Sequence, residues 1–161
     1  RLLTANYHSS IGRTKPLPGN ETTAKFLGYA GLVPFMAFSI GSWISLPYIS
    51  DAVQILIAYA AIILSFMGAI HWGQAMSRTN QQHGKYFIAS VIPALTAWIA
   101  LLLPDTLALV VLVCGFIALY AYDRTVSISQ AFPDWYIPMR KNLTLVVVLC
   151  LSGALLSVAL H

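Results

Sequence analysis

The most constraining feature of this sequence is the run of residues 52–76, which contains no Asp, Glu, Lys or Arg. As a helix, a run of roughly 25 residues is about 37 Å long, which exceeds the hydrocarbon thickness of a bilayer. The run therefore predicts a membrane span that is either tilted or projects beyond the lipid. Ser50 and Asp51 precede it, and both suit the cap position of such a helix.

Composition supports the membrane assignment. The chain has 161 residues, of which 58% are hydrophobic and 9% are charged, whereas a soluble domain has about 25% charged residues. A soluble fold of this length buries too small a fraction of its surface to hide so many apolar side chains. The expected fold class is therefore an all-α polytopic membrane protein with the bilayer as its solvent.

Five apolar segments are predicted to cross the membrane as helices. Pro34 in the first and Pro93 in the third should either kink their helices or be tolerated by neighbouring helices. Residues 1–25 are expected to form a basic, loosely ordered arm, residues 132–142 an interfacial segment, and Asn142 the cap of the last helix. The predicted spans are 26–46, 52–76, 86–103, 107–122 (an extension as far as 131 is left open) and 143–160, within one domain, 26–161.

All nine Lys and Arg residues fall on one side of the membrane under this topology. They lie in the arm 1–25, in the loop 77–85 and in the segment 123–142. The loops on the opposite side, 47–51 and 104–106, and the C-terminus contain none. The positive-inside rule then places the N-terminus inside and the C-terminus outside.

The sequence carries no recognisable catalytic, metal or cofactor motif. HExxH, P-loop and GxSxG patterns are absent, so we expect no enzyme activity. Cys114 and Cys150 lie in apolar runs and are interpreted as small core residues. Haem would need a second axial ligand, but His8, His83 and His161 lie in polar or terminal segments. The net charge of +4 is scattered, which argues against a nucleic-acid partner.

Small residues recur at every fourth position in the second span and form a smooth stripe for close contact with another helix backbone. The stripe comprises Ala61, Ser65, Ala69 and Gly73. His71 lies on the opposite face, where Gly68 leaves a notch beside it. A helix with two packing faces is expected to be central in its bundle.

A layer of polar and aromatic residues is predicted near the inner interface. The second and fourth spans run in the same direction, which puts His71 about 29 Å and Asp123 about 24 Å from their outer starts. One interpretation is a site that relays protons or holds a polar headgroup. The other, which we favour because the layer is not at mid-bilayer, is that these residues only hydrogen-bond within the bundle. The layer comprises His71, Trp72, Tyr122, Asp123, Arg124, Trp135 and Arg140.

Three segments carry a resemblance to one family. They read LSFMGAIHWG at 64–73, LGYAGLVPF at 27–35 and WYIPMRKNLT at 135–144. Together they resemble the domain-of-unknown-function family of small five-span proteins that includes animal transmembrane protein 69, with relatives in proteobacteria and mitochondria. The resemblance covers nearly all of the chain from residue 26 onward and implies a membrane protein of mitochondrial or bacterial descent, with no established activity.

The N-terminal residues bear on location. The chain starts with Arg1, and residues 1–20 contain Arg, Lys, Ser and Thr but no acid, as in the remnant of a mitochondrial targeting region; an ordinary basic tail is the alternative. We expect the mitochondrial inner membrane with the N-terminus in the matrix, or alternatively a bacterial plasma membrane.

The functional expectation is a non-catalytic accessory subunit of a respiratory-chain complex that acts through helix packing. Its expected partners are membrane lipids and other integral membrane subunits. Two alternatives remain open: a small carrier or ligand-binding protein that uses the layer around His71 and Asp123, and a membrane-embedded assembly factor.

Overall fold

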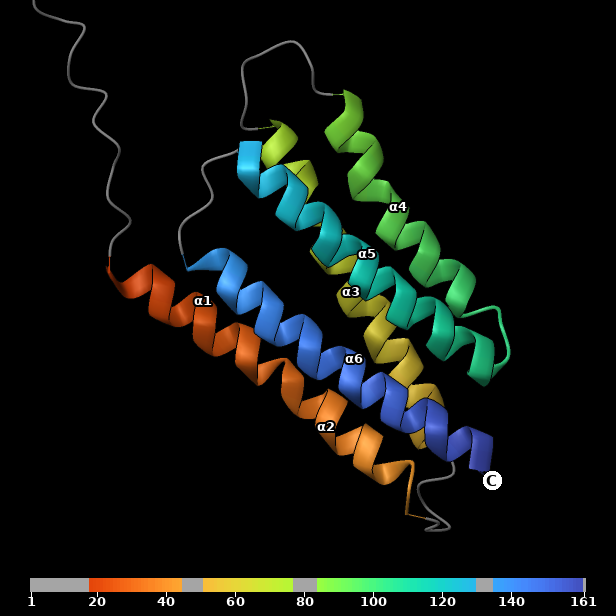
Figure 1. Ribbon diagram of the computed structural model, residues 1–161. Coiled ribbons are helices and arrows are strands. Elements are labelled where there is room, and N and C mark those ends of the chain that lie inside the picture. The colour runs from red at the N-terminus through yellow and green to blue at the C-terminus, as the bar shows by residue number, and fades with distance from the viewer. Residues whose placement is uncertain (1–17, 45–50, 77–83, 130–134, 161) are drawn as a thin grey trace, which may run out of the picture.

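The computed structural model describes residues 18–44, 51–76, 84–129 and 135–160, and every regular element in these ranges is an α-helix. The helices lie side by side in an elongated bundle (Figure 1). They are α1 (Pro18–Ala30), α2 (Leu32–Gly41), α3 (Ala52–Met76), α4 (Gly84–Ala100), α5 (Asp105–Ser129) and α6 (Tyr136–Leu160).

Length and composition support the membrane assignment. Four segments of the described helices are long and apolar enough to cross a bilayer: Glu21–Gly41, Ala52–Gly73, Asp105–Thr125 and Tyr136–Leu160. A shorter apolar helix, Phe87–Ala100, accompanies them. The protein is an all-helical polytopic membrane protein, as predicted.

The first span consists of α1 and α2, which meet at Gly31. The break follows from Pro34, which lacks an N–H and whose ring crowds the carbonyl four residues earlier, at Ala30. The Tyr59 hydroxyl of α3 donates to the Gly31 carbonyl at 2.9 Å, so a neighbouring helix satisfies a backbone group at the break. Pro93, by contrast, lies inside a continuous α4.

Several predicted helix boundaries differ from the structure; the first span, for example, was predicted to end at residue 46, whereas α2 ends at Gly41. Helix α6 begins at Tyr136 and not at Leu143, so Asn142 lies inside the helix and does not cap it. Pro138 permits this early start because proline is tolerated in the first turn, where backbone N–H groups have no partner within the helix. Helix α1 begins at Pro18, inside the predicted arm. Residues 1–17, 77–83 and 130–134 of the predicted arm, loop and interfacial segment lie outside the described residues.

The bundle is centred on α3, which contacts α2, α4 and α5. Buried leucines of α3, Leu56 and Leu64, lie in one apolar core with Leu112 and Phe116 of α5 and Leu151 of α6. Helices α2 and α6 also contact each other through serines: the Ser39 hydroxyl donates to the Cys150 carbonyl at 2.8 Å and Ser157 donates to Ser42 at 3.0 Å. Such bonds join helices where no water is present.

The close contact of α3 with α4 is at Gly68. A Cβ built on Gly68 would lie 2.8 Å from the Ser90 carbonyl oxygen and 3.0 Å from the Pro93 ring. Of the predicted stripe, Ala61 is buried and Ser65 is half-buried, with its hydroxyl bonded to the Ala61 carbonyl.

The prediction of close helix contact is wrong for the inner half of the stripe within this chain. Ala69 and Gly73 are exposed, and nothing lies within 4 Å of a Cβ built on Gly73. The reason is helical geometry: Ala69 is about 100° around the helix from Gly68, so when α4 packs on Gly68 it leaves Ala69 uncovered.

Candidate functional site

Three ionisable side chains from three helices meet inside the bundle. His71 of α3 approaches Asp123 of α5, with Nε2 and Oδ1 2.8 Å apart. Arg140 of α6 donates from Nε to Oδ2 of Asp123 at 2.7 Å, and its Nη2 lies 2.6 Å from the same oxygen. The side chains of His71 and Asp123 are each 1% exposed and that of Arg140 is 2% exposed. The predicted equal depth of His71 and Asp123 is therefore confirmed, and Arg140 rather than Arg124 completes the group.

The charges in this buried trio compensate one another. The guanidinium of Arg140 and the carboxylate of Asp123 form a close ion pair, the arrangement that burial of two charges requires. An ionised carboxylate only accepts hydrogen bonds, so Nε2 of His71 carries the hydrogen that points to Asp123. With the imidazole neutral, the trio has no net charge.

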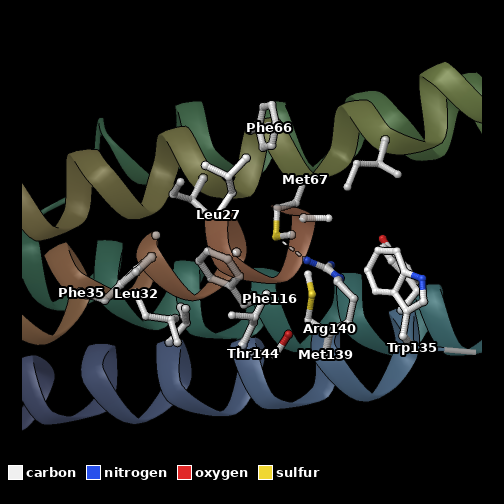
Figure 2. A pocket seen from close by; sticks show the side chains of 18 residues that line it. Leu27, Leu32, Phe35, Phe66, Met67, Phe116, Trp135, Met139, Arg140 and Thr144 are labelled. Carbon is white, nitrogen blue, oxygen red and sulfur yellow. Dashed lines mark hydrogen bonds between the residues drawn. The ribbon is translucent and has the colours of Figure 1, made fainter. Parts of the chain in front are cut away.

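Two further contacts surround the trio. The Nη1 group of Arg140 donates to the sulfur of Met67, as Figure 2 shows. The Tyr122 ring packs edge-on against the His71 ring with 5.1 Å between centroids. The second ring nitrogen of His71, Nδ1, is buried and has no hydrogen-bond partner among the described residues.

The other members of the predicted layer do not join the trio. Trp72 is exposed and its ring packs against Phe87 of α4, with 4.8 Å between centroids. Arg124 is exposed on α5. Trp135 lies directly before α6, where its Nε1 atom is buried without an acceptor among the described residues. The layer thus separates into a buried ionic centre and an aromatic periphery.

A cavity of about 400 Å³ lies beside the trio, between α1, α2, α3 and α6. Arg140 forms part of its wall, and Trp135 lies at the same end (Figure 2). Phe35 and Phe116, both buried, line it farther along, and nearly all of the remaining lining is apolar. The volume falls within the range of about 300–1,000 Å³ that is usual for ligand pockets.

This geometry limits the available chemistry. The trio is internal to the bundle and its two charged groups are already paired, so its one ring nitrogen without a partner among the described residues, Nδ1 of His71, is buried. No group of three or more His, Cys, Asp or Glu residues that could hold a metal ion occurs in the described part of the chain. What the site can do is join three helices and offer an apolar space with polar groups at one end.

Sequence reasoning did not find the cavity or the contact between Arg140 and Met67. The cavity depends on how α1 and α2 lie against α3 and α6, and the contact depends on how α6 lies against α3. No local pattern encodes either arrangement. One sequence pattern does follow the cavity wall: Leu27, Gly31 and Phe35 recur at four-residue spacing, which puts them on one face of the first span.

Comparisons with known proteins find one family model and relatives named as transmembrane proteins. A family model described as "Protein of unknown function (DUF3429)" matches residues 20–156. The chain is 31% identical over 151 residues to transmembrane protein 69 of Xenopus tropicalis, covering 91% of this chain and 59% of the relative. It is also 31% identical over 128 residues to transmembrane protein 69 of Mus musculus, covering 76% and 51%. The chain thus spans between half and three fifths of these relatives. No solved structure matches it significantly.

Proposed function

Given that this chain belongs to the DUF3429 family, we propose that it is a non-catalytic accessory subunit of a mitochondrial inner-membrane complex of the respiratory chain, and that it acts through helix packing. The observation that carries the proposal is the buried trio of His71, Asp123 and Arg140. Polar side chains that relay protons or contact substrates face a water-filled path or cavity. Here Asp123 instead accepts hydrogen bonds from two other helices, so its carboxylate links three helices of the bundle.

The lipid-facing surface of α3 supports a role in assembly. Ala69 and Gly73 lie exposed on this helix, which is otherwise central. Small residues allow a second backbone to approach closely, and membrane helices associate mainly through such packing. We therefore assign this exposed half of the stripe to contact with another integral membrane subunit.

The charge distribution supports the proposed orientation, with the N-terminus in the matrix. Lys25 lies in α1, Arg124 in the last two turns of α5 and Lys141 in the first two turns of α6, whereas Asp105 starts α5. The start of α1, the end of α5 and the start of α6 lie toward one end of the bundle, and the start of α5 lies at the other (Figure 1). Basic residues concentrate on the side from which a membrane protein is inserted. The basic, acid-free residues 1–20 and the resemblance to proteins of mitochondrial descent favour the mitochondrion.

The test is purification from native mitochondrial membranes in mild detergent, followed by native gel electrophoresis. We expect the 17.6 kDa chain to comigrate with a respiratory-chain complex. Migration of the chain alone, or with an unrelated complex, would contradict the proposal.

A matched pair of variants tests the packing surface. Ala69→Leu fills a small-residue position of the stripe, whereas Ile62→Leu, about two turns earlier on the same face, exchanges a large side chain that is 64% exposed for another of similar volume. Both residues are exposed in the isolated chain, so both variants should unfold like the wild type in detergent. Only Ala69→Leu should reduce comigration, because overpacking a close contact costs about 1–3 kcal/mol. Equal comigration of the two variants would show that the stripe faces lipid and does not contact another subunit.

An assembly factor would differ from the proposed subunit only in how long it stays with the complex. A permanent subunit stays with the mature complex throughout a pulse-chase experiment, whereas an assembly factor leaves it. Loss of labelled chain from the complex during the chase, while the complex itself persists, would favour the alternative.

A further inference from the structure

The shape of the cavity restricts what can occupy it. Its lining follows one face of α6 from Trp135 to Val147, a distance of about 18 Å along the helix. A volume of about 400 Å³ spread over that length makes the cavity long and narrow. Figure 2 shows the lining side chains along this elongated space, with Phe35 toward one end and Trp135 at the other.

Two kinds of occupant do not fit these dimensions and this lining. An α-helix with its side chains is about 10–12 Å across, which is too wide for so narrow a space. An extended peptide would bring N–H and C=O groups into a nearly all-apolar space, where each unpaired group costs several kcal/mol. A single hydrocarbon chain is narrow and carries no polar groups that would remain unpaired.

The mouth of the cavity lies on the lipid-facing side of the bundle, where hydrocarbon chains are available. Leu27 of α1 and Phe66 of α3 line it and are 63% and 68% exposed. They therefore lie at its mouth, whereas Phe35, Phe116 and Val147 at its floor are buried. Because the mouth lies between apolar stretches of two membrane spans, it faces lipid.

The polar end of the cavity offers one donor that lacks an acceptor. The indole Nε1–H of Trp135 is buried and unpaired among the described residues. Tryptophan before a membrane span occupies the interface, the depth at which a lipid's polar group meets its chains. An acceptor at this point would satisfy a group whose burial is otherwise unfavourable.

Two cations near Trp135 are already paired. Arg140 is paired with Asp123, and Lys25, whose ammonium lies 6.0 Å from the centroid of the Trp135 ring, is bonded to Glu21 at 2.6 Å. Because both already have a carboxylate partner, a neutral oxygen suits this end of the cavity better than an anionic group.

We propose that this cavity binds one acyl chain of a membrane glycerophospholipid, with the ester carbonyl of that chain accepting a hydrogen bond from Trp135 Nε1. The site goes beyond the assembly role proposed above and does not depend on it. It predicts discrimination between ester- and ether-linked lipids, and little discrimination between headgroups.

The test is lipid titration of the purified, delipidated full chain, followed by native mass spectrometry. The probes are dioleoyl phosphatidylcholine, its dialkyl ether analogue without carbonyl oxygens, and dioleoyl phosphatidylglycerol. The wild type should bind the ester lipid about three- to tenfold more tightly than the ether, the effect of one neutral hydrogen bond. Trp135→Phe keeps a ring without the N–H and should bind both lipids equally, at the weaker level.

A second pair of variants tests the cavity itself. Leu27→Trp narrows the mouth, whereas Phe26→Trp changes an exposed neighbour that does not line the cavity. Leu27→Trp should weaken binding of the ester lipid at least tenfold, and Phe26→Trp should leave it unchanged. If Leu27→Trp fails to accumulate, Ile63→Trp on the cavity wall replaces it, with Ile62→Trp as its control.

Three outcomes would overturn the proposal. Equal binding of ester and ether lipids by the wild type would show that no hydrogen bond from Trp135 to the ester carbonyl contributes to binding. Equal binding by the Leu27→Trp and Phe26→Trp variants would locate retained lipid elsewhere on the surface. A preference of more than tenfold for phosphatidylglycerol would mean that headgroup charge, and not the ester, is recognised.

Discussion

Asp123 accepts hydrogen bonds on both carboxylate oxygens, one from α3 and one from α6, so substitutions of its partners leave different groups unsatisfied. His71→Leu removes the donor to Oδ1 and should destabilise the bundle by about 1–3 kcal/mol. His71→Gln restores an amide donor and should recover most of that loss. Equilibrium unfolding in mixed detergent micelles measures both. A functional defect of His71→Gln in a normally accumulating protein would instead show that the imidazole has a role beyond structure.

The ion pair between Asp123 and Arg140 should behave non-additively. Asp123→Asn leaves the buried guanidinium without a counterion, and breaking a buried pair in this way costs about 3–5 kcal/mol. Adding Arg140→Met removes that orphaned charge and should recover part of the loss, because apolar replacement of both charges is often neutral. The same unfolding assay, applied as a double-mutant cycle, checks this. Additive losses would mean that the two side chains act independently.

How far the sequence predicts these residues depends on the kind of information each contact needs. The meeting of His71 with Asp123 was predictable, because helix rise and span direction alone put them at one depth. The sequence did not predict that Arg140, and not Arg124, pairs with Asp123. Both are basic residues of the same layer, and which of them points into the bundle depends on the rotation of its helix. Arg140 points into the bundle while Arg124 is exposed.

Two glycines of α3 should respond in opposite ways to the same change. Gly68→Ala places a methyl group 2.8 Å from the backbone carbonyl of Ser90, which cannot move without shifting α4, so we expect a loss of about 1–3 kcal/mol. Gly73→Ala meets nothing within 4 Å and should gain about 0.5–1 kcal/mol from the lower backbone entropy of alanine. Unfolding of the isolated chain in detergent gives both values. A loss at Gly73 of the size expected at Gly68 would contradict the packing described here.

Helix boundaries were predictable where hydrophobicity changes abruptly and less so where it does not. The range 52–76 coincides with α3 because polar residues border that apolar run. The start of α6 was placed too late because Pro138, Arg140 and Lys141 resemble a loop. Arg140 is tolerated inside the helix only through its pairing with Asp123, a tertiary contact that hydropathy does not register.

The arrangement of helices as a whole was only partly predictable. The up-and-down order follows from short connections and from the segregation of Lys and Arg. The cavity does not, because it depends on how far α1 lies from α3, and α1 makes its contacts with α2 and α6. Small differences in tilt of the first span would open or close this space without altering any sequence pattern.

The orientation in the membrane gives the last prediction. Among the described residues, α5 separates Asp105 at its start from Asn142, an exposed residue in the first part of α6, so we expect these two positions to face opposite compartments. In a background with Cys114→Ala and Cys150→Ala, Asp105→Cys should react with an impermeant maleimide only from the intermembrane space. Asn142→Cys should react only from the matrix, the side of the basic residues. The Cys150 substitution should preserve the link to α2, because the group that Ser39 contacts is the Cys150 backbone carbonyl. Reversed labelling would invert the proposed orientation, and labelling of both positions from one side would mean that α5 does not cross the membrane.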